Sequence, residues 1–215
     1  ESLTEIIFTE DSNLASIGNE AFKYAFSLTS INIPGSVDSI GNEAFRYAES
    51  LTSIKIPASV TSIGDYAFAY TAKLQNITVD KNNNDYSSDD NGVLFNKDKT
   101  ILLKYPTGSN NDSYTVPDTV ETIEDRSFAI LYYSDNNTLR TIILNDGLKN
   151  INNRAFRNVD LPSINIPASV TSIGDYAFYG ARSLTSINIP ASVTSIGISA
   201  FAYTAKLQNI KVELA

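Results

Sequence analysis

The chain has 215 residues, 42% of them hydrophobic and 10% aromatic, which is enough apolar material for a packed core and excludes a wholly disordered chain. The formal net charge is −8 at pH 7, so nucleic acid and anionic membranes are not expected as partners, because both repel an acidic protein. Cysteine, histidine, methionine and tryptophan are absent, which excludes disulfides, thiolate metal sites and the common catalytic triads.

The composition also bears on where the chain works. It contains no methionine, so we expect a mature product or an excised fragment, with any signal peptide outside the sequence given. No apolar run approaches the roughly 20 residues of a membrane span. We therefore predict a soluble segment without a membrane-spanning helix.

A unit of 23 residues recurs along the chain. Residues 28–50 read LTSINIPGSVDSIGNEAFRYAES, and residues 51–73 read LTSIKIPASVTSIGDYAFAYTAK. The same phrase returns at Leu161 and Leu184. A period of roughly 20–30 residues is typical of a solenoid, in which each unit stacks only on its neighbours. We therefore predict a single solenoid over residues 1–215.

Each unit is expected to open with a half-buried strand. Leu28, Ile31 and Ile33 are apolar and are separated by polar residues, an alternation that indicates one buried and one exposed face. Because proline has no N–H to donate to a neighbouring strand, it ends the strand in five units, at Pro34, Pro57, Pro117, Pro167 and Pro190.

The second half of a unit contains a short extended segment and a turn. Val37 and Ile40 precede Gly41, and glycine recurs at this position as Gly18, Gly64, Gly174 and Gly197. We expect a positive φ angle there. The following residues, such as 65–67, are predicted to form about one turn of helix. One phenylalanine per unit then predicts a stacked aromatic spine, formed by Phe22, Phe45, Phe68, Phe128, Phe156, Phe178 and Phe201.

Stacking is required because about seven apolar positions per unit face inward and one unit cannot bury them alone. If neighbouring units lie about 4.8 Å apart, which is the spacing between paired strands, each unit buries the apolar side chains of the next. The predicted fold is therefore a right-handed superhelix with a parallel β-sheet on one face. Short strands, turns and short helical turns are expected on the other face.

The repeat is interrupted by an insertion over residues 80–113. It opens with the polar run DKNNNDYSSDDNG. Two apolar runs, 93–95 and 100–105, then flank the polar residues 96–99, a pattern that predicts a β-hairpin. A smaller bulge, LYYSDNN, follows at residues 131–137. Insertions in solenoids form loops on one side, often the side that binds a ligand.

The phrase LTSIxIPxSVTSIGxxAFxxxxxL resembles the BspA-type leucine-rich repeat of bacterial surface proteins, over nearly the whole chain. The segment NGVLFNKDKTILLKYP also resembles an insertion found in such proteins. The resemblance implies a leucine-rich-repeat solenoid that is secreted or anchored at the cell surface and takes part in adhesion. It implies no catalytic residues. The family often has cysteine three residues after the phenylalanine, where this chain has Ala25, Ala48, Thr71, Ala181 and Thr204.

The polar positions of the strands are the first candidate binding surface. They form two rows, one of Glu5, Ser30, Ser53, Asn76, Ser163, Ser186 and Asn209, and one of Ile7, Asn32, Lys55, Thr78, Ile143, Asn165, Asn188 and Lys211. Hydroxyl and amide groups in regular rows could hydrogen-bond a peptide or a glycan. The alternative is that these residues are only the solvated side of the sheet. The candidate ligand-binding residues in these rows are Ser30, Asn32, Ser53, Lys55, Asn76, Asn165 and Asn188.

Two further features of the sequence bear on ligand binding. Tyr47 and Tyr70 lie two residues after their phenylalanines and could stack on a sugar ring or anchor a partner, although covering a turn is the favoured alternative. The run from Asp80 to Asn84 resembles the start of a calcium loop, but Asp85 stands where such a loop needs glycine. We therefore predict no metal site and no cofactor.

The sequence favours a non-enzymatic protein, because no unit carries a constellation of reactive side chains that the others lack. We predict an extracellular or surface-anchored binding or adhesion module that contacts proteins or glycans of a host or neighbouring cell through the repeated concave surface. Many weak contacts along such a surface would add up. The alternative is a structural spacer with no ligand of its own.

Overall fold

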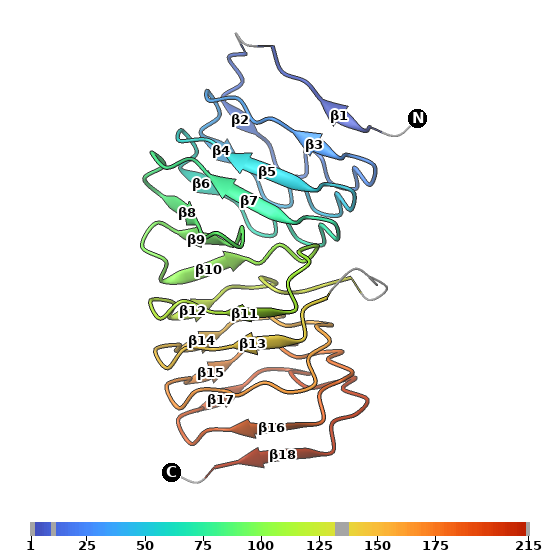
Figure 1. The fold of residues 1–215 in the computed structure, drawn as a ribbon, viewed down its shortest axis with the longest axis vertical. Coiled ribbons are helices and arrows are strands. Elements are labelled where there is room, and N and C mark those ends of the chain that lie inside the picture. The colour runs from blue at the N-terminus through green and yellow to red at the C-terminus, as the bar shows by residue number, and fades with distance from the viewer. Residues whose placement is uncertain (1–2, 10–11, 132–137, 214–215) are drawn as a thin grey trace. The chain divides into compact units, whose positions relative to one another are not determined.

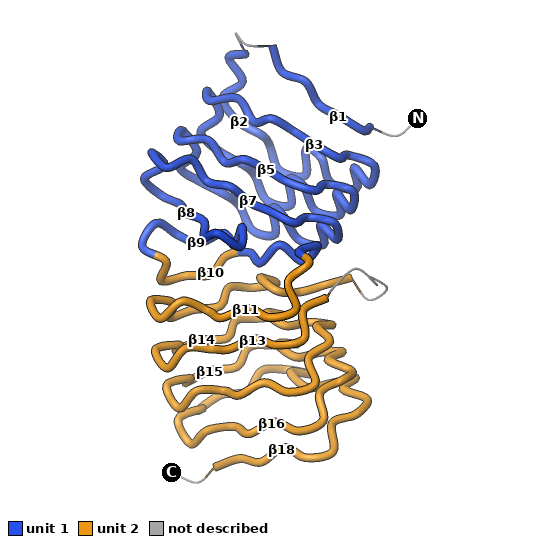
Figure 2. Tube along the Cα trace, in the orientation of Figure 1, with its two compact units in different colours: residues 1–98, 104–109 blue, residues 99–103, 110–215 orange. Residues whose placement is uncertain are grey.

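The computed structural model describes residues 3–9, 12–131 and 138–213. The chain divides into two compact units, shown in Figure 2. Unit 1 comprises residues 1–98 and 104–109, and unit 2 comprises residues 99–103 and 110–215. The bulge predicted at 131–137 lies, apart from Leu131, outside the described residues.

The described residues form short β-strands joined by turns (Figure 1). Unit 1 contains β1 (Glu5–Ile6), β2 (Ser16–Ile17), β3 (Ser30–Ile31), β4 (Ser39–Ile40), β5 (Ser53–Ile56), β6 (Ser62–Ile63), β7 (Asn76–Val79), β8 (Tyr86–Ser88) and β9 (Leu94–Asn96). After β10 (Ile101–Lys104), unit 2 contains β11 (Ser113–Thr115), β12 (Thr122–Ile123), β13 (Thr141–Ile143), β14 (Asn150–Ile151), β15 (Ser172–Ile173), β16 (Ser186–Ile189), β17 (Ser195–Ile196) and β18 (Asn209–Val212).

Strands β1 to β7 of unit 1 stack in parallel, as the repeat predicts. Each repeat contributes two strands. The first strands of successive repeats pair as β1 with β3 and β5 with β7, and the second strands pair as β2 with β4 and β4 with β6. The register joins equivalent residues, because Ser53 lies opposite Asn76 and Ser39 lies opposite Ser62. Unit 1 is therefore a parallel β-solenoid in which each coil is one repeat.

Unit 2 follows the same plan. Its second strands pair in parallel as β12, β14, β15 and β17, and its first strands pair as β11 with β13 and β16 with β18. Residues 161–166, between β13 and β16, form no strand. The physical reason is Pro162, since the residue at this position donates its N–H to the preceding coil elsewhere, as Gln208 does to the carbonyl of Thr185.

The core consists of the apolar positions that the repeat predicts. In the second coil Leu28, Ile31, Ile33, Val37, Ile40, Ala44 and Phe45 are all buried. The phenylalanines stack on one another, with ring centroids 5.4 and 5.7 Å apart from Phe22 through Phe68 in unit 1. In unit 2 the distances are 5.1 to 5.4 Å from Phe128 through Phe201. The aromatic spine is therefore a core element of each unit.

The prediction of short helical turns is wrong, because no helix is present in the described residues. Successive N–H groups alternate between two kinds of acceptor. Ala44 and Arg46 donate within the turn, to residues three positions earlier, whereas Phe45 and Tyr47 donate to carbonyls of the following coil. Glu43 and Tyr47 have φ angles of 55° and 63°, which are outside the right-handed helical region.

The expectation of a positive φ at the recurring glycine is also wrong, because Gly41 and its equivalents are absent from the residues with positive φ. They are required by close approach between coils. A Cβ atom on Gly41 would lie 2.4 Å from the backbone nitrogen of Asn19, and one on Gly64 would lie 2.4 Å from that of Asn42. A side chain on either glycine would therefore collide with the preceding coil, whereas Glu124 and Asn152 occupy the equivalent position in unit 2.

The insertion contains an antiparallel pair, β8 with β9, in which Tyr86 lies opposite Asn96. β9 overlaps the first of the two apolar runs and β10 lies in the second, so both runs form strands, and β8 is a further strand that precedes them. It lies against the last coil of unit 1, since the hydroxyl of Ser88 accepts a hydrogen bond from the N–H of Val79 and the hydroxyl of Tyr86 accepts one from the N–H of Ile63. The insertion therefore supplies hydrogen-bond partners to the edge of the solenoid in unit 1.

Candidate functional site

The polar rows of unit 1 lie on the exposed side of β1, β3, β5 and β7. The alternation within each strand produces this face, because Ile54 and Ile77 point into the core and their neighbours point outward. Parallel pairing in register then aligns equivalent residues from coil to coil. An isolated bridge between Asn32 and Lys55 continues the alignment from β3 to β5.

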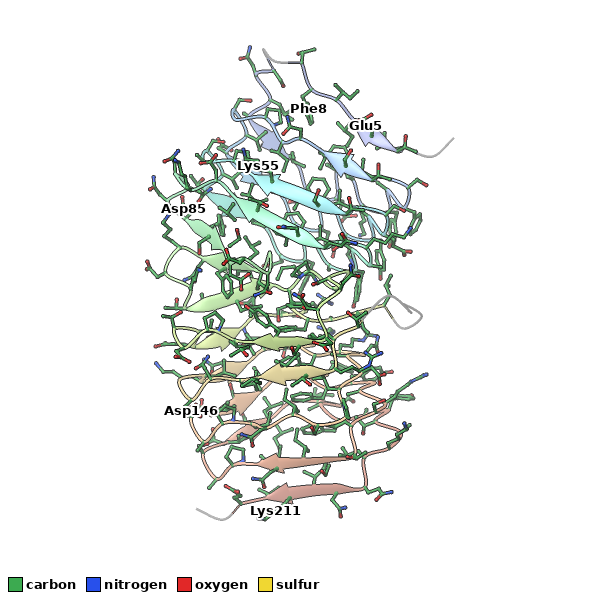
Figure 3. All side chains as sticks on the ribbon, viewed as in Figure 1. Glu5, Phe8, Lys55, Asp85, Asp146 and Lys211 are labelled. Atoms are coloured by element: carbon green, nitrogen blue, oxygen red, sulfur yellow. The ribbon has the colours of Figure 1, made fainter. Side chains whose placement is uncertain are left out.

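Five of the predicted residues, Ser30, Asn32, Ser53, Lys55 and Asn76, are exposed on this surface, which we call the strand face of unit 1. Figure 3 shows its side chains, with Glu5 and Lys55 labelled. The face carries small hydroxyl and amide side chains around one ammonium group. The Nζ atom of Lys55 lies 3.9 Å from the Oδ2 atom of Asp80, at the limit of an ion pair. Such an exposed contact is weak and leaves the ammonium group accessible.

The insertion borders the strand face at Asn76. The N–H of Ile77 donates to the carbonyl of Gly92, which precedes β9. A Cβ atom on Gly92 would lie 2.7 Å from the Oδ1 atom of Asn76, so the two residues are in close contact. The Oδ1 atom of Asn76 also accepts a hydrogen bond from the hydroxyl of Thr78 at 3.1 Å. The amide of Asn76 is therefore held in place at the margin of the face.

Two predicted residues belong to the corresponding face of unit 2. Asn165 is exposed. Asn188 is half-buried, lies opposite Lys211 in the pairing of β16 with β18, and donates from its Nδ2 atom to the Oε1 atom of Glu213 at 2.6 Å. Ile143 is an exposed apolar residue on the same face. The structure thus brings the unit 1 residues together and places Asn165 and Asn188 in a separate set.

The two predicted tyrosines belong to a stacked ladder on the turn side of unit 1. Tyr47 stacks on Tyr24 and on Tyr70, with ring centroids 5.1 and 5.0 Å apart. The guanidinium group of Arg46 lies over the rings of Tyr47 and Tyr70. Tyr70 is buried and offers little surface to a ligand, whereas Tyr47 is half-buried and Tyr24 is exposed. The ladder packs the turns against each other.

Sequence reasoning missed an ion-pair network beside this ladder. Lys23 contacts Glu20 at 2.8 Å and Glu43 at 2.7 Å, and Glu43 also contacts Arg46 at 2.8 Å. Hydrogen bonds to Glu20 and Glu43 raise the pKa of Lys23 to about 12. The hydrogen bonds from Lys23 and Arg46 lower the pKa of Glu43. The spacing of Glu20 and Lys23, repeated 23 residues later as Glu43 and Arg46, was the signal in the sequence.

The loop that resembles a calcium site is organised by a buried asparagine. The Nδ2 atom of Asn83 donates to the carbonyls of Pro57 and Val60, and its Oδ1 atom accepts from the N–H groups of Asp85 and Tyr86. Within the described part of the chain, no group of three or more Asp, Glu, His or Cys residues is placed to hold a metal ion.

The described residues also contain no helix long and apolar enough to cross a membrane.

This combination of parallel coils, a buried aromatic spine and a polar strand face defines a leucine-rich-repeat solenoid. The chain belongs to the family described as the BspA type leucine rich repeat region, which matches residues 1–90 and 105–214 with six copies. The family is defined by its repeat and indicates no enzymatic activity. No curated protein matches the chain.

Solved structures of similar fold support the assignment. The pneumococcal vaccine antigen PcpA is 30% identical with a TM-score of 0.82, and the match covers 96% of this chain and 56% of that protein. A leucine rich cell surface protein from Faecalibacterium prausnitzii is 27% identical with a TM-score of 0.78, over 99% of this chain and 60% of that protein. A leucine-rich repeat protein from Bacteroides ovatus is 25% identical with a TM-score of 0.63, and the match covers 94% of this chain and 47% of that protein. The chain therefore spans about half of the length of these proteins.

Proposed function

We propose that the chain is a non-catalytic, cell-surface binding module that contacts extracellular proteins or glycans through the strand face of unit 1. The proposal is supported by the family and by two relatives, of which one is a vaccine antigen and the other a cell surface protein. The observation that carries it is the register of exposed polar residues along β3, β5 and β7, which presents hydroxyl, amide and ammonium groups in rows.

The face suits a broad and weakly selective contact. It has small side chains, so a flat partner can approach the sheet closely and hydrogen-bond to several coils at once. Lys55 adds a positive charge to a protein of net charge −8, and this favours an acidic group on the partner at that point. The insertion beside Asn76 closes one margin of the face and would select partners by shape.

The experiment compares two serines of one coil. Ser53 in β5 and Ser62 in β6 are both exposed, but only Ser53 lies on the strand face of unit 1. The wild-type chain, Ser53→Tyr and Ser62→Tyr would be tested against an array of glycans and purified extracellular matrix proteins. We expect saturable binding that Ser53→Tyr reduces at least about tenfold, which corresponds to about 1.4 kcal/mol, and that Ser62→Tyr leaves unchanged.

Two results would contradict the proposal. Equal loss in both variants would place the contact elsewhere. Binding of no probe above background by the wild-type chain would favour the alternative from the sequence, a structural spacer that has no ligand of its own.

A further inference from the structure

The turns of unit 2 carry arginine where two turns of unit 1 carry glutamate. In unit 1 Arg46 stands three residues after Glu43 and contacts it at 2.8 Å. In unit 2 the position of this glutamate is occupied by Arg126 and Arg154 in successive coils. The backbone supports the equivalence, since Glu43 and Arg154 both donate an N–H to the following coil and have φ angles of 55° and 57°. The position three residues after Arg154 holds a further arginine, Arg157.

The carboxylate of Asp125 is shared by two of these arginines. The Nη1 atoms of Arg126 and Arg154 each lie 3.9 Å from an oxygen of Asp125, at the limit of an ion pair. Within the described residues Arg154 makes no other ion pair. Two more carboxylates on these turns accept hydrogen bonds from amide groups of the following coil, that of Glu124 at 2.9 Å and that of Asp175 at 2.6 Å. The positive charge of Arg154 is therefore only weakly compensated and attracts a further anion.

Tyrosines of the next coil hold the two arginines of one turn in place. The Cζ atom of Arg154 lies 5.0 Å from the ring centroid of Tyr176, and that of Arg157 lies 5.1 Å from the ring centroid of Tyr179. The two rings meet edge to face at 5.7 Å. All four residues are half-buried, and we call them the turn face of unit 2. A guanidinium group stacked on a ring is oriented by it and keeps its N–H groups for an anion.

We infer that the turn face of unit 2 binds a sugar that carries one carboxylate, such as a terminal uronic or sialic acid. A planar carboxylate matches the guanidinium fork, which can donate two parallel N–H bonds to it. The apolar side of the sugar ring packs against the exposed part of the tyrosine rings. This site goes beyond the strand face of unit 1 and is independent of it, because the four residues all belong to unit 2.

The charge of the protein favours a single acidic sugar over a polyanion. The chain has a net charge of −8, so a long polyanion is repelled by the acidic surface around the turn face. Charges are screened beyond about 8 Å at physiological ionic strength. One acidic sugar therefore responds to the local arginines, whereas the other groups of a polyanion would meet the acidic remainder of the protein.

The test is an NMR titration of the isotope-labelled full chain with methyl glucuronide and with N-acetylneuraminic acid, which distinguish a uronic from a sialic acid. Methyl glucoside is the matched control, because it has a hydroxymethyl group where the glucuronide has its carboxylate. Acetate supplies the carboxylate without a ring. At least one acidic sugar should bind at least about tenfold more tightly than either control and should shift the amide signals of residues 154–157 and 176–179.

Three results of this titration would overturn the proposal. Absence of binding by both acidic sugars would show that the turn face is not a sugar site. Methyl glucoside binding as tightly as the acidic sugars would show that the carboxylate is not recognised. Acetate binding as tightly would show that the sugar ring contributes nothing.

Substitution of Arg154 separates binding from folding. Arg154→Glu places a glutamate three residues before Arg157 and so restores the ion pair that Glu43 and Arg46 form in unit 1. We expect binding of the acidic sugar to weaken at least about tenfold, while the thermal unfolding midpoint stays unchanged or rises. Arg46→Gln is the matched control, since it removes an arginine that is stacked on tyrosine but paired with glutamate. It should leave binding of the sugar unchanged.

A second variant tests the geometry of the contact. Arg154→Lys keeps the positive charge and loses the planar fork, so its affinity for the acidic sugar should lie between those of the wild type and Arg154→Glu. Wild-type affinity in Arg154→Lys would refute recognition by the fork. Wild-type affinity in Arg154→Glu, or an equal loss in Arg46→Gln, would refute the site itself.

Discussion

Replacing Asn83 is the sharpest test of how the insertion is attached to unit 1. Its side chain is fully buried and makes four hydrogen bonds, to the carbonyls of Pro57 and Val60 at 2.8 and 2.9 Å and from the N–H groups of Asp85 and Tyr86 at 2.9 and 2.8 Å. Asn83→Ala removes all four. At about 0.5–1.5 kcal/mol for each bond, the expected loss is about 2–6 kcal/mol, a large part of the roughly 5–15 kcal/mol that stabilises a typical domain.

The assay is urea unfolding followed by tyrosine fluorescence, together with amide hydrogen exchange of β8 and β9. Asn83→Asp should destabilise unit 1 at least as much as the alanine variant, because a carboxylate oxygen in place of Nδ2 would face the carbonyl oxygens of Pro57 and Val60 without a proton to donate. Asn82→Ala is the control, since Asn82 is the adjacent and exposed residue of the same loop. A loss below about 1 kcal/mol in Asn83→Ala, the worth of one hydrogen bond, would refute the assignment of this residue as the attachment point.

Two further changes test the core and the pH dependence. Phe68→Ala opens the aromatic spine where the ring is stacked on Phe45. The free energy of unfolding should fall by about 3–5 kcal/mol in the same urea assay. A fall of less than about 1 kcal/mol would show that the stack is not part of the core. Burial lowers the pKa of Lys104 to about 7, so between this value and its ordinary value of 10.5 the unfolded chain binds a proton that the folded chain lacks. The free energy of unfolding should therefore rise with pH from about 7 upward. Lys104→Met should lose this rise, as measured by unfolding curves between about pH 7 and 9.5. The same dependence of the unfolding free energy on pH in both proteins would contradict the lowered pKa of Lys104.

The parallel stacking could be predicted because its cause lies in local patterns. The alternation of Leu28, Ile31 and Ile33 identifies a strand with one buried side, and repetition at a fixed period places equivalent strands next to each other. The phenylalanine column follows from the same argument. The polar rows could be predicted as well, since a residue between two buried isoleucines on a strand must point outward.

The errors arose where the cause is a contact between coils. A glycine that allows a positive φ and a glycine that allows a close approach look the same in one sequence, and only the distance between Gly41 and the backbone of Asn19 separates them. The left-handed conformation instead falls on residues such as Tyr47 and Tyr66, which have no local reason to adopt it. Interactions with the next coil over-determine these residues and offset the cost of the conformation.

The same limit applies to the candidate site. The run from Asp80 to Asn84 departs from a calcium loop in its sequence, but nothing in that run predicts that the side chain of Asn83 donates to two carbonyls of the preceding coil, 23 and 26 residues away. The position of the insertion beside Asn76 likewise depends on the close contact with Gly92. Sequence identified the strand face of unit 1, and the structure supplied its margin.

The alternating acceptors in the turn that contains Ala44 to Tyr47 constrain how proteins of this kind can vary. Removing or adding a single residue there would exchange the two sets of amide groups. The N–H groups that donate to the following coil would then point into their own turn, and those that donate within the turn would point at the following coil. Point replacements leave this alternation intact, whereas changes in length destroy it. Lineages carrying this architecture should therefore keep the length of this turn, and small insertions or deletions should fall at other places, as in the layer of 22 residues that begins at Leu139 and in residues 80–113.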